Sequence, residues 1–173
     1  MISSAFAIPE NSRYFEDYVP GLVLEFGSVP LSQSEIIQFA EQFDPQAIHT
    51  SPEAAARGPY GGLIASGWQT VNVMMRLCVK HFLSDASSMG SPGIDELRWM
   101  KPVRPGDTLG VRVSILEANR SRSKPDRGLV RAVFEVLNQH REVVLRMKTM
   151  SLIRCREAEP AKAERMHAEA GRN

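Results

Sequence analysis

The chain has 173 residues, of which 43% are hydrophobic and 24% are charged, and its net charge is +1. This length favours one domain with a substantial core, and the composition is typical of a soluble globular protein. The near-neutral charge gives no electrostatic argument for a nucleic-acid partner or an anionic membrane.

The spacing of the cysteines, the first ten residues and the lengths of the apolar runs do not suggest an extracellular or membrane protein. Cys78 and Cys155 have no C-x-x-C spacing, which predicts neither a disulfide framework nor a zinc site. Residues 1–10 lack the basic start and the apolar run of a signal peptide. No apolar run approaches the roughly 18 residues that a membrane span needs. We therefore expect a reduced, cytoplasmic setting, with no membrane and no nucleic acid as partner.

The first part of the chain predicts an arm followed by a strand. Residues 1–20 are rich in aromatic and acidic side chains, and we expect an irregular arm that lies on this subunit or on a partner. Apolar residues then alternate over residues 21–29, which predicts a strand. Pro30 is expected to close it.

Two short helices are predicted next. Ser32 and Glu35 form a capping box, in which each side chain reaches the backbone N–H of the other residue. Asp44 precedes a proline and therefore predicts the end of this first helix. Ser51, followed by Pro52, predicts the start of the second helix.

The rest of the chain predicts one long helix and then four strands. From Leu63 to about Leu83 apolar residues fall on nearly every side of a helix, which is typical of a buried helix. Alternating residues then predict strands over 94–100, 108–117, 129–138 and 142–153. We expect an α+β domain over residues 21–154, with an antiparallel sheet curled around the central helix. Residues 155–173 are expected to form a surface helix or a frayed tail.

Asp44 and His49 are the first candidates for catalysis. Five positions separate them in a loop between predicted helices, so a carboxylate and an imidazole can share one water and transfer its protons. The spacing alone is a weak pattern. Asp before Pro is a common helix terminator, and a lone His is often structural, so this alternative remains open.

The glycine pair Gly61 and Gly62 precedes the predicted long helix. The first N–H groups of a helix have no internal acceptor and lie at its positive end, where they can stabilise an enolate oxygen. The alternative is that the glycines only allow a tight turn.

Several residues of the predicted helix are candidates for supporting roles. Gly67 lowers helix stability, which indicates a close packing partner. Thr70 is a candidate to hydrogen-bond the catalytic loop, unless its hydroxyl binds its own helix backbone. Trp68 and Met74, with the adjacent Met75, are expected in the core or in a pocket wall. Ser66 accompanies Gly67 as a supporting residue.

These residues together resemble a known family. The run F-D-P-Q-A-I-H-T-S-P-E-A-A, followed by Y-G-G-L-I-A-S-G-W-Q-T, resembles the MaoC-like dehydratases. They are relatives of the (R)-specific enoyl-CoA hydratases and have the hot-dog fold. The later W-M-K-P-V-R-P-G-D-T-L is similar to the strand–turn–strand of that family. The resemblance covers roughly residues 21–153. Gln46 and Ala47 depart from it, because the hydratase motif has Asn-Pro there.

The resemblance implies reversible hydration of a 2-enoyl thioester to an (R)-3-hydroxyacyl thioester. It implies Asp44 and His49 as the catalytic pair, Gly62 as the N–H donor to the thioester oxygen, and Thr70 as the hydroxyl that orients the Asp. No metal or other cofactor is implied; CoA or acyl carrier protein carries the substrate. It also implies a homodimer or a dimer-based oligomer. Two alternatives remain open: a hot-dog acyl-CoA thioesterase and a non-catalytic subunit that binds acyl thioesters.

Overall fold

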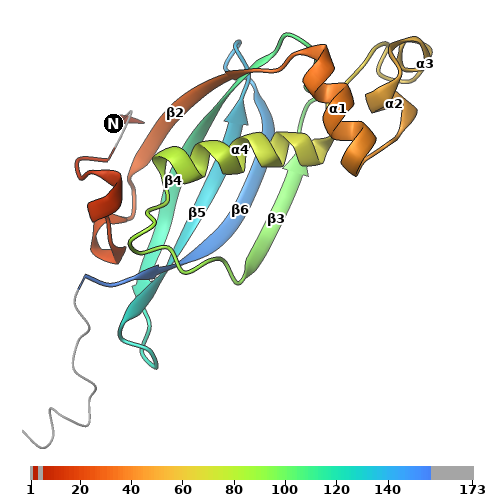
Figure 1. Ribbon diagram of the computed structural model, residues 1–173. Coiled ribbons are helices and arrows are strands. Elements are labelled where there is room, and N and C mark those ends of the chain that lie inside the picture. Colours follow the sequence, from red (N-terminus) through yellow and green to blue (C-terminus); the bar gives the residue numbers. More distant parts are fainter. Residues whose placement is uncertain (1, 4–5, 157–173) are drawn as a thin grey trace, which may run out of the picture.

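The computed structural model describes residues 2–3 and 6–156. A six-stranded sheet has the strand order β1-β2-β4-β5-β6-β3 (Figure 1). The strands are β1 (Ile2–Ser3), β2 (Val23–Pro30), β3 (Gly93–Trp99), β4 (Thr108–Arg120), β5 (Arg127–Leu137) and β6 (Val143–Arg154). The short β1 is parallel to β2, and the pairings of β2 to β6 are antiparallel. The helix α4 (Gly67–His81) crosses the concave face of the sheet, which confirms the α+β fold with a central helix (Figure 1).

The core lies between α4 and the sheet. Alternate residues of β4 are at most 2% exposed, as the alternation predicted: Leu109, Val111, Val113 and Ile115. They share a hydrophobic cluster with Leu77 and Met74 of α4. Arg112, one of the intervening residues, lies on the other face, where it pairs with Glu25 and Glu135 at 2.6 and 3.2 Å.

The predicted short helices are present. The helix α1 (Gln33–Phe43) begins with the capping box, because Ser32 Oγ accepts from the Glu35 N–H while the Glu35 carboxylate accepts from the Ser32 N–H. Asp44 is its C-terminal cap residue. Ser51 caps α3 (Pro52–Ala56) by accepting from the Ala54 N–H. An additional single turn, α2 (Ala47–Thr50), carries His49 where the sequence predicted only a loop.

The prediction for the long helix was wrong at its start and about its burial. The helix α4 begins at Gly67 and is capped by Ser66, several residues after Gly62. Leu63, Ile64 and Ala65 are buried but not helical. The Ile64 N–H donates to Ile48 O of α2 at 3.3 Å, and the Ala65 N–H donates to Val103 O at 2.8 Å. The helix also exposes an apolar stripe, made of Trp68, Met75 and Val79, each about half exposed.

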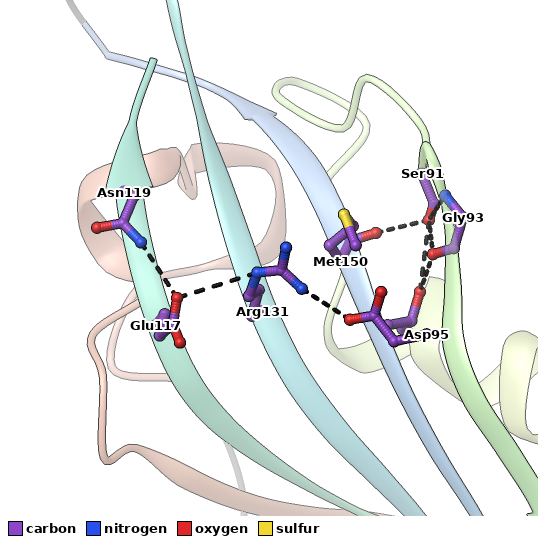
Figure 2. Close-up of polar contacts among 8 residues, drawn as sticks. Ser91, Gly93, Asp95, Glu117, Asn119, Arg131 and Met150 are labelled. Carbon is purple, nitrogen blue, oxygen red and sulfur yellow. Dashed lines mark hydrogen bonds and ion pairs between the residues drawn. The ribbon is translucent and has the colours of Figure 1, made fainter. Parts of the chain in front are cut away.

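The edge strand β3 is tied to the sheet by side chains at its start (Figure 2). Ser91 Oγ donates to the carbonyl oxygen of Met150 at 2.6 Å, and Thr149 Oγ1 donates to that of Gly93 at 2.7 Å. Arg131 of β5 reaches Asp95 of β3 at 2.7 Å. These contacts fix the strand whose last residue is Trp99.

The N-terminal arm packs on its own subunit. Tyr18 is 1% exposed and donates a hydrogen bond of 2.9 Å from its hydroxyl to Phe82 O. The buried Arg13 donates from Nη1 to His81 O and Phe82 O, at 2.8 and 3.1 Å. The guanidinium also lies 4.5 Å from the centre of the Phe6 ring. The arm therefore closes the C-terminal end of α4.

Three further expectations concerned the cysteines, membrane-spanning helices and the C-terminal tail. Cys78 and Cys155 are both buried and free of disulfide bonds. In the described part of the chain, none of the helices has the length and apolar content required to cross a bilayer. The predicted tail over 155–173 lies almost wholly outside the described residues.

Candidate functional site

A cavity of about 470 Å³ lies at the start of α4. Three segments form its walls: the turn from α1 into α2, the segment that leads into α4, and the end of β3 with the residues that follow it. Its lining includes Asp44, His49, Gly67, Thr70 and Trp99. Residues far apart in the sequence therefore meet around one space that is large enough for a small acyl group.

Asp44 and His49 face each other in this cavity. His49 Nε2 lies 3.4 Å from Asp44 Oδ2. The single turn of α2 accounts for this geometry, because it brings the imidazole back toward the residue that ends α1. The His49 side chain is 7% exposed and that of Asp44 is 17% exposed, so the carboxylate is the more accessible of the two.

The position of His49 is fixed by the backbone that leads into α4. Its Nδ1 lies 2.9 Å from the carbonyl oxygen of Ile64. A carbonyl oxygen only accepts, so Nδ1 must carry the hydrogen, an assignment that follows from the hydrogen-bond network. In the neutral imidazole Nε2 is then free to accept a proton on the side that faces Asp44.

Both carboxylate oxygens of Asp44 accept hydrogen bonds. Gln46 Nε2 donates to Oδ1 and Ser66 Oγ donates to Oδ2, each at 2.7 Å. These bonds, first that from Gln46 and then that from Ser66, lower the pKa of Asp44, against a smaller opposing effect of burial; the nearby His49 lowers it further. Asp44 is therefore a carboxylate at neutral pH.

The supporting residues differ in where the structure places them. Ser66 is 0% exposed and bridges Asp44 to α4, because its Oγ also accepts from the Trp68 N–H at 3.2 Å. Thr70 lines the cavity, but in the described part of the chain the hydroxyl that holds Asp44 is that of Ser66. Gly62 lies in the turn before α4 and is not among the cavity residues. The prediction that Gly62 opens the helix is wrong, and Gly67 occupies that position.

The expected close packing at Gly67 is present. A Cβ atom there would overlap the indole of Trp99, with Cε2 at only 2.6 Å. Only glycine leaves room for this contact between α4 and the end of β3.

The two residues predicted for the substrate pocket line different cavities. Trp68 lines the first cavity, where its ring meets that of Trp99 edge to face at 5.6 Å. Met74 is 1% exposed and lines a second, mainly apolar cavity of about 250 Å³, together with Met75. This second cavity is lined by residues of α4, β3, β5 and β6, and its lining residue Val71 follows Thr70, which lines the first cavity.

Sequence reasoning gave no role to Gln46 or Trp99. Gln46 was noticed only as a departure from a motif, although its amide holds Asp44. Trp99 ends a strand far along the chain from Asp44 and His49, and no local pattern connects it with them. Only the pairing of β3 with β6 brings Trp99 beside α4.

Comparisons with known proteins agree on one family. Residues 18–135 match the model of the MaoC like domain. The protein YdeM of Bacillus subtilis, itself uncharacterised, is 28% identical over 124 residues, which cover 72% of this chain and 86% of the relative. The 3-hydroxybutyryl-CoA dehydratase of Methylorubrum extorquens is 33% identical over 109 residues, or 60% of this chain and 64% of that protein.

A solved structure of the same family is similar over most of this chain. The MaoC-like dehydratase from Rhodospirillum rubrum superposes with a TM-score of 0.79 and 36% sequence identity, over 84% of this chain and 99% of that one. The match of the family model over residues 18–135 includes the central helix and the segment that carries Asp44 and His49.

Proposed function

Since the chain belongs to the MaoC-like dehydratase family, we propose that it catalyses the reversible hydration of a 2-enoyl thioester to an (R)-3-hydroxyacyl thioester. The observation that carries this proposal is the arrangement of Asp44 and His49 at one wall of a cavity. The named dehydratase of Methylorubrum extorquens supports the same class of reaction. The family thus gives the hydro-lyase class, and the geometry suggests how the reaction proceeds.

The proposed catalytic pair holds one water. Asp44 is ionised and accepts from the water, while Nε2 of neutral His49 accepts its second hydrogen. During hydration the water oxygen bonds to C3 of the substrate and one of the hydrogens reaches C2, so the C2=C3 double bond becomes single. Both added groups come from the same side, because Asp44 and His49 lie on the same wall of the cavity.

The thioester oxygen becomes negative in the enolate, and a donor must face it. We assign this role to the backbone N–H of Gly67 rather than Gly62. Gly67 is the first residue of α4 and lines the cavity, and the N-terminus of a helix favours negative charge. A helix of 15 residues provides this terminus.

The two cavities suggest where the acyl group lies. The reacting carbons are proposed to lie in the first cavity, beside Trp68, with the tail of a longer acyl chain in the second, beside Met74. CoA or acyl carrier protein would carry the thioester, and the proposed reaction uses only water as co-substrate. A series of 2-enoyl-CoA substrates of increasing length, assayed with wild type and Met74→Phe, tests this placement. The larger side chain should reduce turnover of long substrates more than that of crotonyl-CoA.

A second copy of the chain is the proposed partner. The strand β3 is at one edge of the sheet, where its outer backbone groups face no further strand in the described part of the chain. Ile94, Trp99 and Met100 are about half exposed along this edge, next to the apolar stripe of α4. An uncovered strand edge with apolar residues favours association, so we propose a homodimer joined along β3.

One assay separates the proposed hydratase from the two alternatives. Crotonyl-CoA is incubated with the protein while loss of the enoyl absorbance and release of free thiol are measured in parallel. A hydratase consumes the enoyl group without thiol release, a thioesterase releases thiol, and a binding subunit does neither although it binds the ligand. Coupling to an (R)-3-hydroxyacyl-CoA dehydrogenase then identifies the stereoisomer of the product.

Two variants test the catalytic pair. Asp44→Asn and His49→Gln should each lower the hydration rate by at least about 100-fold, as for loss of a general acid–base group. Asp85→Asn is the matched control, because Asp85 is exposed and outside the cavity. If Asp44→Asn hydrates crotonyl-CoA as fast as the wild type, the assignment of the pair is wrong.

A further inference from the structure

Trp99 is placed at the catalytic cavity by two contacts. It is the last residue of β3, and its indole lies against Gly67 so closely that a Cβ atom on Gly67 would overlap the ring. Its ring also packs edge to face on Trp68, with an interplanar angle of 79°. About half of the residue remains exposed, and Trp99 is among the residues that line the cavity.

The Trp99 atom nearest to the position that a Cβ on Gly67 would take is the polar one, Nε1. Nε1 lies closer to that position than the other two ring atoms near it, Cε2 and Cδ1. The Cα–Cβ bonds of a helix tilt toward its N-terminus, which is also the direction in which the first N–H groups point. Nε1 of Trp99 therefore lies at the same end of α4 as the N–H of Gly67.

Neither of these two donors is occupied by the protein. Within residues 2–3 and 6–156, the hydrogen bonds include none from the Gly67 N–H and none from Trp99 Nε1. The next N–H of the helix, that of Trp68, is already bonded to Ser66 Oγ. Two free donors thus belong to residues that line one cavity together with Asp44 and His49.

We propose that Trp99 is a further catalytic residue, whose indole N–H and the Gly67 N–H together donate to the thioester oxygen. This inference rests on the proposed hydration and adds a second donor to it. Both donors bind the oxygen more strongly as it gains charge in the enolate, which lowers the barrier to addition at C3. No bond forms to Trp99, and no proton leaves it.

The contact with Gly67 also explains how the donor keeps its position. The edge-to-face packing on Trp68 limits rotation of the Trp99 ring. The strand that carries Trp99 is tied to β6 along its length, from Gly93 opposite Met150 to Trp99 opposite Leu145. A donor held in advance costs no rearrangement during the reaction.

Trp99→Phe removes the N–H and keeps an aromatic ring. We expect kcat for crotonyl-CoA to fall about 10- to 100-fold, which is a smaller loss than that for removal of a fully buried oxyanion donor. KM should change by less than about threefold. Such a split indicates an interaction made chiefly in the transition state. Trp68→Phe is the comparison, because its ring lines the same cavity without facing Gly67 so closely; it should act mainly on KM.

A spectroscopic measurement tests the donor without turnover. Butyryl-CoA has no double bond to hydrate, and a ¹³C label identifies its thioester C=O stretch in the infrared spectrum of the complex. Binding to the wild type should lower this frequency, Trp99→Phe should reverse part of the shift, and Trp68→Phe should retain it. A Trp99→Phe variant with wild-type kcat and the wild-type carbonyl frequency would overturn the proposal.

A second substitution avoids any defect in folding. The chain has two tryptophans, so a Trp68→Phe chain retains only Trp99, which can then be replaced by benzothienylalanine during expression. This analogue has sulfur in place of N–H and nearly the same shape. A smaller carbonyl shift in that protein than in the Trp68→Phe chain with natural Trp99 supports the donor, whereas an equal shift contradicts it. If the wild type hydrates no enoyl-CoA, the proposed function fails, and the carbonyl shift still decides whether Trp99 donates.

Discussion

Ser66 Oγ donates a hydrogen bond of 2.7 Å to Asp44 Oδ2, which joins the residue that caps α4 to the residue that ends α1. The same oxygen of Asp44 is the one that faces His49 Nε2. One hydroxyl therefore connects the start of the central helix with the proposed catalytic pair. Ser66 is a positioning residue in this arrangement, because it acts through Asp44.

Ser66→Ala should alter both the reaction and the stability. Loss of the hydrogen bond should lower kcat about tenfold and raise the pKa of Asp44. Loss of the helix cap should cost about 1 kcal/mol of the free energy of unfolding. Rates are measured over a range of pH, and stability is measured by urea denaturation. Ser66→Thr keeps the hydroxyl and should recover most of the lost kcat and most of the lost free energy of unfolding. The exposed Ser123→Ala is the neutral control. Equal kcat values for Ser66→Ala and the control would refute the role.

Gln46→Ala should move the acid limb of the pH–rate profile upward. Gln46 makes the largest contribution to the lowered pKa of Asp44, so its removal raises that pKa. Activity that needs the carboxylate is lost as the pH falls through the pKa of Asp44, and in the variant this loss must occur at a higher pH. The midpoint of log(kcat/KM) against pH measures the shift. Gln46→Asn tests whether a shorter amide reaches Asp44; an unshifted midpoint in Gln46→Ala would contradict the proposed contact.

Ile94→Lys should prevent dimer formation through β3. Ile94 is 52% exposed at the strand edge, and a charge there opposes burial against a second copy. Sedimentation equilibrium should find dimers for the wild type and monomers for the variant at the same concentration. Leu116→Lys is the matched control, since Leu116 is 43% exposed on β4, between β2 and β5. If Ile94→Lys forms dimers with the same dissociation constant as the wild type, the interface lies elsewhere.

Arg13→Met should weaken the attachment of the N-terminal arm. Arg13 is 3% exposed, and its guanidinium holds the last carbonyl groups of α4. Hydrogen bonds to charged groups contribute about 1.5–3 kcal/mol, and the variant should lose an amount in this range. Thermal and urea unfolding measure the loss, with the exposed Arg122→Met as control. A variant as stable as this control would show that the arm is held by its aromatic residues alone.

Local patterns were sufficient to predict most of the elements. The capping box at Ser32 and Glu35 and the alternation along β4 depend on neighbours in sequence, and both predictions are confirmed. The start of α4 was missed for a physical reason. Leu63, Ile64 and Ala65 are apolar because a non-helical segment passes through the core, and a short apolar run does not reveal whether it is helical.

The proposed site was only partly predictable, because its contacts join distant segments. The spacing of Asp44 and His49 pointed to a pair, and both residues line the same cavity. The bonds to Asp44 from Ser66 and from Gln46 depend on where α4 begins and how α2 turns. The sequence assigned the N–H donor to Gly62, which lies in a turn, whereas α4 begins at Gly67. No sequence pattern distinguished which of these glycines opens the helix.

The strand order has a consequence for synthesis of the protein. β3 precedes β4, β5 and β6 in the chain, yet within the described residues its partner is β6. Trp99 therefore has no place in the sheet until residues 143–154 have left the ribosome, and such distant pairings form slowly. The Asp44 side of the cavity needs only earlier residues. During synthesis the wall with the proposed acid–base pair can assemble first, and the wall that would bind the thioester oxygen is completed with the last strand.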